Sequence, residues 1–199
     1  MLICPVSPDC LVHIEALYRS VAEEMRGTAH DVWWEFGVHP THDGLTASLQ
    51  AGNLFVAYED DRGTSSRGAG SQPGDAAASA SRPIGAFVLD GRQGKDYAVA
   101  PWGVDAPSEH VAVLHLLAVA PYARGRGVAR ALLSAAAAEA RVRGAWTLRL
   151  DVFDNNAPAI ASYTAFGFAD RGVFDIEVGG GLRHASHLME LDLREGEDA

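Results

Sequence analysis

The chain has 199 residues, 48% of them hydrophobic, and a formal net charge of −10. This length suits one domain with its own core, and the composition excludes a disordered chain. A nucleic-acid partner is not expected, because phosphate binding needs a basic surface. The acidic balance favours solubility and would also attract cationic molecules.

The N-terminus offers no targeting signal. Residues 1–10 lack the basic start and long apolar stretch of a signal peptide. No apolar run approaches the roughly 20 residues that cross a bilayer. We therefore expect a cytoplasmic protein without membrane contact. Cys4 and Cys10 supply no metal framework, so no metal is expected; they are interpreted as reduced, with a disulfide left open.

Two helices are predicted at the start of the chain. Ser7 and Pro8 are typical of a helix start, because serine caps free amides and proline suits the first turn. Apolar side chains then recur at helical spacing as far as Met25. A second, short helix is expected over 44–51, and an aromatic-rich connection, 31–40, joins the two.

Two strands follow, over residues 53–58 and 83–89. Between them, residues 60–82 are rich in Gly, Ser and Ala and show no apolar periodicity, which predicts a mobile insertion. The residues before this insertion are too few for a separate core. We therefore expect a single domain over 1–199.

The second half of the chain predicts a sheet covered by helices. Residues 109–119 are almost wholly apolar, which is typical of a central strand buried on both faces. A helix is expected over 127–143, with one apolar face formed by Val128, Leu132, Ala135, Ala138 and Val142. The remaining expected elements are a strand over 147–153, a helix over 157–166 and a hairpin of strands over 167–178 and 184–193. Together they predict an α/β (α+β) fold with a mixed, mostly antiparallel sheet of about six to seven strands.

The most informative stretch is residues 115–130, where a buried strand leads into a glycine-containing loop and then a helix. This order directs several free backbone amides at one place, and the helix dipole adds positive charge there. A phosphate binds naturally at such a place, and glycine lets it approach the backbone. A P-loop is excluded by Val128 and Ala129, and a dinucleotide fingerprint by Arg130.

The loop resembles the cofactor motif of the GNAT acetyltransferase superfamily, Arg/Gln-x-x-Gly-x-Gly/Ala, which Arg124, Gly127 and Ala129 satisfy. Residues 156–168 resemble the family's second motif, an asparagine-led helix followed by Tyr-x-x-x-Gly-Phe. The two motifs stand in the family's order, one helix and one strand apart. Taken alone, the glycines would also suit a tight turn, and Asn156 would also suit a helix cap. The two motifs together favour the family.

The resemblance implies acetyl-CoA as co-substrate. Its pyrophosphate would lie on the loop amides and its pantetheine arm along the strand that ends at Val119, while the backbone amide of Leu117 would polarise the thioester carbonyl. The implied cofactor-binding residues are Leu117, Ala118, Val119, Arg124, Gly125, Arg126, Gly127, Val128, Ala129, Arg130, Asn156 and Ala159.

Tyr163 matches the family's general acid, which assists the departing CoA thiolate. A free tyrosine has a pKa of about 10 and a thiol one of about 8.5, so full proton transfer would cost about 2 kcal/mol. A hydrogen bond that strengthens as charge develops on sulfur is as plausible as complete transfer. The alternative interpretation of this residue, which the motif favours less, is a core aromatic.

The acceptor amine also needs a base. Some family members place a glutamate on the central strand, where this chain has Val113. His115, two residues further along the same face, is the candidate base, although a buried histidine is more often a packed residue. The alternatives, acting through water, are Glu35, His39, His42 and His187.

In the family the connection between the first two helices borders the acceptor cleft, so Trp33, Trp34 and Glu35 are the expected substrate-binding residues. Aromatic rings beside a carboxylate suit a cation, and equally suit a loop packed onto the core. We expect an N-acetyltransferase that acts on a primary amine of a small molecule or peptide. The alternatives are a non-catalytic acyl-CoA-binding sensor or interaction module, and transfer of a bulkier acyl group. A homodimer is common among the relatives.

Overall fold

The computed structural model describes residues 1–59, 82–179 and 182–194. A seven-stranded sheet organises them in the order β1-β2-β3-β4-β5-β7-β6. Among these residues β4 and β5 pair in parallel, and the other neighbours pair antiparallel. The strands are β1 (Leu2–Pro5), β2 (Leu54–Tyr58), β3 (Pro83–Asp90), β4 (Val111–Val119), β5 (Thr147–Phe153), β6 (Ala169–Gly179) and β7 (Leu182–Asp192). The predicted mixed, mostly antiparallel sheet is confirmed.

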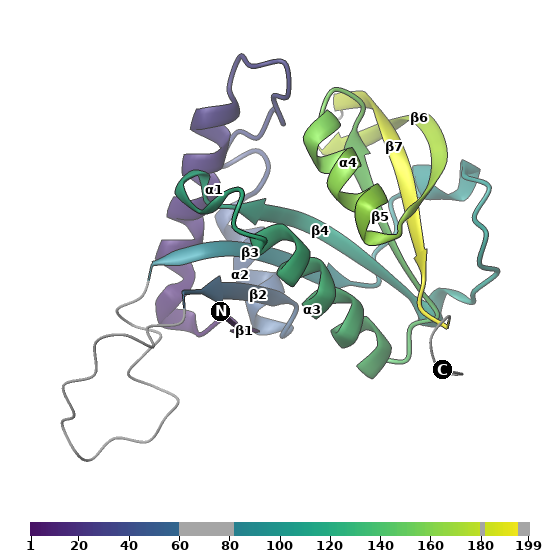
Figure 1. The fold of residues 1–199 in the computed structure, drawn as a ribbon, viewed down its shortest axis with the longest axis horizontal. Coiled ribbons are helices and arrows are strands. Elements are labelled where there is room, and N and C mark those ends of the chain that lie inside the picture. The colour runs from purple at the N-terminus through teal and green to yellow at the C-terminus, as the bar shows by residue number, and fades with distance from the viewer. Residues whose placement is uncertain (60–81, 180–181, 195–199) are drawn as a thin grey trace.

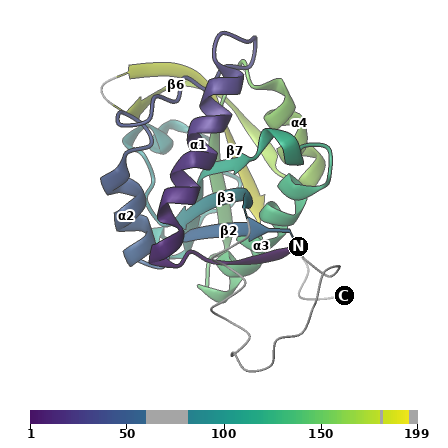
Figure 2. The same ribbon diagram turned by 90° about the vertical axis from the view of Figure 1, so that its left-hand side faces the viewer.

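Helices cover both faces of this sheet (Figures 1 and 2). On one face lie α1 (Leu11–Met25) and α2 (His42–Gln50); on the other lie α3 (Val128–Val142) and α4 (Ala157–Phe166). Core side chains from both helix layers pack on β2, β3, β4 and β5. In the part of the chain that is described, no helix has the length and apolar character to traverse a bilayer.

Strands β4 and β5 are neighbours over only a short length. Residues 111–113 pair with 147–149, and beyond them the two strands diverge (Figure 1). A β-bulge interrupts β4 at this point: its register with β3 shifts between Ala86 and Val88, and Leu116 has a φ of 52°. A bulge bends its strand. The sheet therefore opens into a wedge next to the bulge.

The N-terminal prediction needs two corrections. Leu2–Pro5 form an edge strand, β1, that was not expected, because four residues are too few to display an alternating pattern. The helix begins later than predicted, since Pro8–Cys10 form a 3₁₀ turn and α1 starts at Leu11. The side chain of Ser7 makes no capping hydrogen bond. The second helix instead starts two residues early, capped by Thr41, which accepts from the Gly44 N–H at 2.9 Å.

The predicted buried face of α3 is wrong at its C-terminal half. Ala138 is exposed, and Val142 is 82% exposed. Several alanine faces are compatible with the spacing, and the sequence does not show which one meets the sheet. The buried residues of this helix are Val128, Leu132, Leu133, Ala136, Ala137 and Ala140. Alanines on the buried face allow close approach to the sheet.

Two further expectations concern the cysteines and the insertion. Cys10 is buried and Cys4 half-buried, and neither forms a disulfide, in agreement with their interpretation as reduced. The insertion predicted at 60–82 lies, apart from Arg82, outside the described residues.

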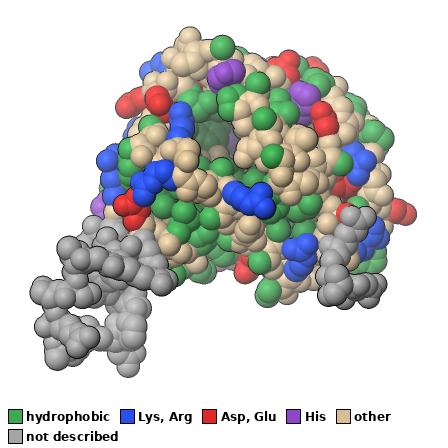
Figure 3. Space-filling view, in the orientation of Figure 1, with side chains coloured by type: hydrophobic (Ala, Val, Ile, Leu, Met, Phe, Trp, Pro, Cys, Tyr) green, Lys and Arg blue, Asp and Glu red, His purple; other side chains and the backbone are tan. Residues whose placement is uncertain are grey.

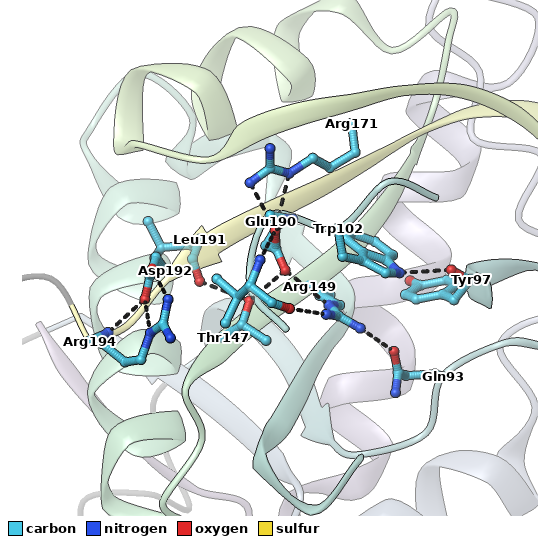
Figure 4. Close-up of polar contacts among 12 residues, drawn as sticks. Gln93, Tyr97, Trp102, Thr147, Arg149, Arg171, Glu190, Leu191, Asp192 and Arg194 are labelled. Atoms are coloured by element: carbon cyan, nitrogen blue, oxygen red, sulfur yellow. Dashed lines mark hydrogen bonds and ion pairs between the residues drawn. The ribbon is translucent and has the colours of Figure 1, made fainter. Parts of the chain in front are cut away.

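A buried ionic cluster centred on Glu190 ties the β3–β4 connection to the sheet (Figure 4). Glu190 is 1% exposed. Its Oε1 accepts from Thr147 Oγ1 at 3.1 Å and from Arg149 Nε at 3.2 Å. Its Oε2 accepts from the Gly103 N–H at 2.7 Å and from Arg171 Nε at 3.1 Å. One carboxylate thus joins β5, β6, β7 and the connection.

Arg149 extends the cluster along the same connection. It donates to Gln93 Oε1 at 2.8 Å and lies 4.2 Å from the ring centre of Trp102. The Trp102 indole N–H donates to the Tyr97 carbonyl at 2.7 Å. The position of Tyr97 therefore depends on the buried charges.

We expect Glu190→Gln to lower the free energy of unfolding by about 3–5 kcal/mol, because it leaves Arg149 as an uncompensated buried charge. Urea denaturation at neutral pH measures the change. Glu139→Gln is the matched control: Glu139 also accepts from an arginine Nε, that of Arg143 at 2.9 Å, but its side chain is 33% exposed. Its i,i+4 pair should contribute only about 0.3–0.5 kcal/mol. Equal losses in the two variants would contradict the role of the cluster.

Candidate active site

Two pockets open where β4 and β5 diverge. The larger, here named the loop pocket, has a volume of about 640 Å³ and is bordered by α1, the end of β4, the loop 124–130 and α4. The smaller, here named the histidine pocket, has a volume of about 450 Å³ and includes His39 and His115 in its lining. Figure 3 shows a hollow lined by hydrophobic side chains on this face, between α1 and α4. Leu116 lines the histidine pocket and Leu117 the loop pocket, so the bulge lies at their boundary.

The loop pocket has the geometry of an anion site. Gly125 and Gly127 have left-handed backbones, with φ of 72° and 75°. The first hydrogen bond of α3 runs from the Ala131 N–H to the Gly127 carbonyl at 3.1 Å, so the amides of the preceding turn take no part in the helical ladder. A Cβ on Gly127 would meet nothing within 4 Å. The residues of the first turn line the loop pocket, and their amides, which the helix leaves unpaired, can hold a phosphate there.

The structure brings nearly all the predicted cofactor-binding residues together in this pocket. Its lining includes Leu117, Ala118, Val119, Arg124, Gly125, Gly127, Val128, Ala129, Arg130, Asn156 and Ala159. Arg126 does not line it in the described structure; its guanidinium pairs with Glu59 at 2.5 Å on the surface. Arg124 lines the pocket and also pairs with Glu24 at 2.8 Å.

Tyr163 lies on α4 in the wall of the loop pocket and is 9% exposed. Asn156 caps this helix by accepting from the Ala159 N–H at 3.4 Å, and Gly167 ends it with a φ of 120°. Burial, and secondarily the charge of Asp151, raise the pKa of Tyr163. The phenol therefore stays protonated at neutral pH and keeps its O–H as a hydrogen-bond donor.

His115 in the histidine pocket is paired with a carboxylate. Its Nε2 lies 3.2 Å from Asp90 Oδ1. Burial disfavours the charged form of Asp90, but hydrogen bonds from His115 and Arg92 outweigh it and lower the pKa of Asp90 to about 2. An ionised carboxylate only accepts, so Nε2 is the nitrogen that carries the hydrogen in this contact, which leaves Nδ1 as the one that can accept a proton.

Sequence reasoning missed Asp90. It directly follows the strand predicted over 83–89 and is the last residue of β3, and only the pairing of β3 with β4 reveals its partner. Val88 lies opposite His115 in that pairing, which places Asp90 one diagonal step away on the same face.

His39 lines the histidine pocket as well. Loss of hydration lowers the pKa of His39, the charge of Asp151 opposes this, and His115 adds to it. The ring is therefore neutral at pH 7. Asp151 accepts from the Tyr97 hydroxyl at 2.7 Å, which links this pocket to the buried cluster of Figure 4.

The remaining candidate bases do not reach this pocket in the described structure. His42 pairs with Glu15 at 2.6 Å, and His187 pairs with Asp170 at 2.7 Å. Glu35 is exposed and belongs to the lining of neither pocket.

The three predicted substrate residues are thus divided. Trp34 lines both pockets. Trp33 and Glu35 line neither; the Trp33 ring instead stacks on His184, with 4.3 Å between ring centres. Val113 is fully buried and packs beside Ile176 and Leu188, so β4 presents no carboxylate there.

A buried tyrosine holds the bulge from α1. Tyr18 is 1% exposed, and its hydroxyl donates to the Leu116 carbonyl at 2.8 Å. Because a trans peptide is planar, the same hydrogen bond fixes the direction of the Leu117 N–H at the other end of that peptide unit.

Comparison with known proteins agrees with this geometry. The model of the acetyltransferase (GNAT) family matches residues 48–168, which include both sequence motifs. Streptothricin acetyltransferase of Streptomyces lavendulae is 40% identical over 75 residues, 38% of this chain. That match spans only 40% of the relative's length.

Solved structures share the fold. An N-acetyltransferase from Staphylococcus aureus Mu50 has a TM-score of 0.63 at 20% identity, over 96% of this chain and 98% of that one. The yncA protein of Salmonella typhimurium, solved with its cofactor acetyl-CoA, has a TM-score of 0.60 at 18% identity, over 97% and 94%.

We expect Asp90→Asn to make the free energy of unfolding less dependent on pH in the acidic range. Asp90 has a folded pKa of about 2, and an unfolded aspartate has one of about 3.9. A lowered carboxyl pKa stabilises the fold above the unfolded value, and this contribution is lost as the pH falls through the folded value. The variant should therefore be about 1–2 kcal/mol less stable at pH 7, with a difference that shrinks from pH 4 to pH 2.

Chemical denaturation at a series of pH values measures this effect. Asp105→Asn, at an exposed position, is the control and should follow the wild type throughout. A stability difference for Asp90→Asn that stays constant down to pH 2 would contradict the assignment.

Proposed function

Since the chain belongs to the GNAT acetyltransferase family, we propose that it transfers the acetyl group of acetyl-CoA to a primary amine of a small molecule or peptide. Acetyl-CoA is the co-substrate of this family, as expected from the motifs. The observation that carries the proposal is the pair of pockets meeting at the β4 bulge. One is lined by the first turn of α3 and by Tyr163; the other is lined by two histidines.

The loop pocket suits CoA along its length. The pyrophosphate lies on the first-turn amides of α3, with Arg124 and Arg130 in the same lining. The pantetheine arm follows residues 117–119 of β4. These residues lie beyond the part of β4 that pairs with β5, so the arm occupies the place of an added strand.

The amine nitrogen attacks the thioester carbonyl carbon, so that a C–N bond forms and the C–S bond breaks. Negative charge passes first to the carbonyl oxygen, where the Leu117 N–H stabilises it, and then to the departing sulfur. His115 takes the proton of the amine at Nδ1. The products are the acetylated amine and CoA.

Tyr163 donates a hydrogen bond to the leaving sulfur. Burial raises its pKa above the ordinary value, so complete proton transfer to a thiolate costs more than the about 2 kcal/mol expected for the free groups. A hydrogen bond that strengthens as the charge develops avoids that cost. The thiolate then takes its proton from solvent.

The histidine pocket favours a cationic acceptor. Asp96, Asp151 and Glu177 line it together with Arg92. Lys95 pairs with Glu177 at 2.5 Å and Arg183 with Asp96 at 3.4 Å, whereas Asp151 accepts from the neutral Tyr97 hydroxyl at 2.7 Å, so its charge is the one that an acceptor cation can meet. An amine that carries a second positive charge is attracted to such a pocket and to a chain of net charge −10. Since one relative is named for streptothricin, that antibiotic heads the acceptors to be tested.

Released thiol, followed with acetyl-CoA and a panel of amines, tests the proposal. The panel contains streptothricin, polyamines, amino acids, peptides and aminoglycosides. We expect turnover with at least one amine, and Tyr163→Phe should lower kcat by about 10²-fold with unchanged acetyl-CoA affinity. Tyr122→Phe is the control, because it removes a tyrosine hydrogen bond to a carbonyl, that of Pro83 at 2.9 Å, outside both pockets. CoA binding without turnover on any amine would favour the sensor.

Gly127→Val tests the phosphate site. A valine there places methyl groups in the space beside the first-turn amides, so CoA affinity should fall by about tenfold or more. Gly144→Val is the matched control, because Gly144 has a similar φ of 79° but lies at the other end of α3, outside the loop pocket. Calorimetric titration with CoA measures both. Equal CoA affinity for the wild type and Gly127→Val would place the pyrophosphate elsewhere.

A further inference from the structure

Two aromatic residues stand where the pockets meet. Trp34, from the connection between α1 and α2, lines both the loop pocket and the histidine pocket. Phe153, the last residue of β5, does the same. These are the residues common to both linings in the described structure, and the bulge at Leu116 and Leu117 borders the same place.

We propose that Trp34 and Phe153 form a wall that limits the transferred acyl group to a short chain. The inference rests on the proposed function. The acyl carbon must touch the sulfur on the loop-pocket side and the amine on the histidine-pocket side, so it lies at this boundary. Each further carbon of a longer acyl chain then has to fit against the two rings.

The ring of Trp34 packs against the core. Its ring meets that of Tyr18 edge to face, with 5.6 Å between the ring centres. Tyr18 in turn is buried and fixed by its hydrogen bond to the Leu116 carbonyl at 2.8 Å. The indole therefore cannot withdraw toward α1 without breaking contacts of the core and of the bulge.

Phe153 is backed by a stack of two rings. Trp33 and His184 lie against each other with 4.3 Å between centres, and Phe153 meets both edge to face, at 5.2 Å and 5.3 Å. His184 comes from β7 and Trp33 from the connection after α1, so two distant segments support the ring. This arrangement gives Trp33 a role beside the pocket rather than in it.

A rigid wall discriminates by size, because a packed site cannot accept an added methylene without displacing a neighbour. Pockets that reject one methylene do so by about 10–200-fold. We therefore expect the wild type to favour acetyl-CoA over propionyl-CoA by at least about tenfold in kcat/KM, and butyryl-CoA to be poorer still.

Trp34→Leu and Phe153→Leu test the wall, each as the full chain. For each variant, kcat/KM is measured with acetyl-, propionyl- and butyryl-CoA, and the dissociation constants of acetyl-CoA and butyryl-CoA are measured by calorimetry without acceptor. We expect the preference for acetyl over butyryl to fall by at least about tenfold in kcat/KM, with butyryl-CoA binding more tightly than to the wild type. The matched controls are Trp146→Leu and Phe174→Leu, which lie outside both pockets and should keep the wild-type preference.

The outcomes separate the two hypotheses. A wild type that uses butyryl-CoA as well as acetyl-CoA, or variants with unchanged acyl preference, would overturn the wall and leave the acetyltransferase intact. If no amine is acetylated, the proposed function fails, and the hypothesis of the wall is then tested by the dissociation constants alone. Unchanged relative affinity for butyryl-CoA in both variants would overturn it.

Discussion

The early end of the β4–β5 pairing is the constraint on which the site depends. Neighbouring parallel strands normally stay hydrogen-bonded along their length, so that the backbone N–H and C=O groups facing each other are paired. Here residues 111–113 pair and the following residues do not, because the bulge at Leu116 turns the strand away. Backbone groups next to the opening become available to a ligand. The buried hydroxyl of Tyr18 keeps the bulge in place, so a residue of the core controls the geometry of a surface cleft.

Burial separates the protonation roles around this opening. Tyr163 is buried and its pKa rises, so it stays a donor. Asp90 is buried too, but hydrogen bonds from its neighbours outweigh desolvation and keep it ionised. The pKa of His39 is lowered, so its ring stays neutral. In the proposed reaction, a donor faces the leaving group and proton acceptors face the amine, without a carboxylate at the position of Val113. The negative charge that would attract the proton is supplied instead by Asp90 through His115.

The features that the sequence predicted are local in the chain. The loop 124–130, the cap at Asn156 and the helix end at Gly167 each follow from a few consecutive residues, and the structure has them where expected. What was missed depends on contacts between distant segments. Tyr18 is an ordinary buried position of an amphipathic helix until its hydroxyl meets Leu116, 98 residues away. Likewise, which face of an alanine-rich helix such as α3 is buried depends on how the helix packs on the sheet.

Contacts with distant segments also explain why Trp33 and Trp34, adjacent in sequence, have different surroundings. Trp33 has a left-handed backbone, with a φ of 47°, which breaks the regular path of the chain between them. Trp34 then meets Tyr18 and the bulge, and Trp33 meets Phe153 and β7. One short segment therefore braces both sides of the boundary between the pockets. Because β7 also carries Glu190, the aromatic contacts and the buried charges are anchored on the same strand, and the two pockets are bordered by parts of one connected core.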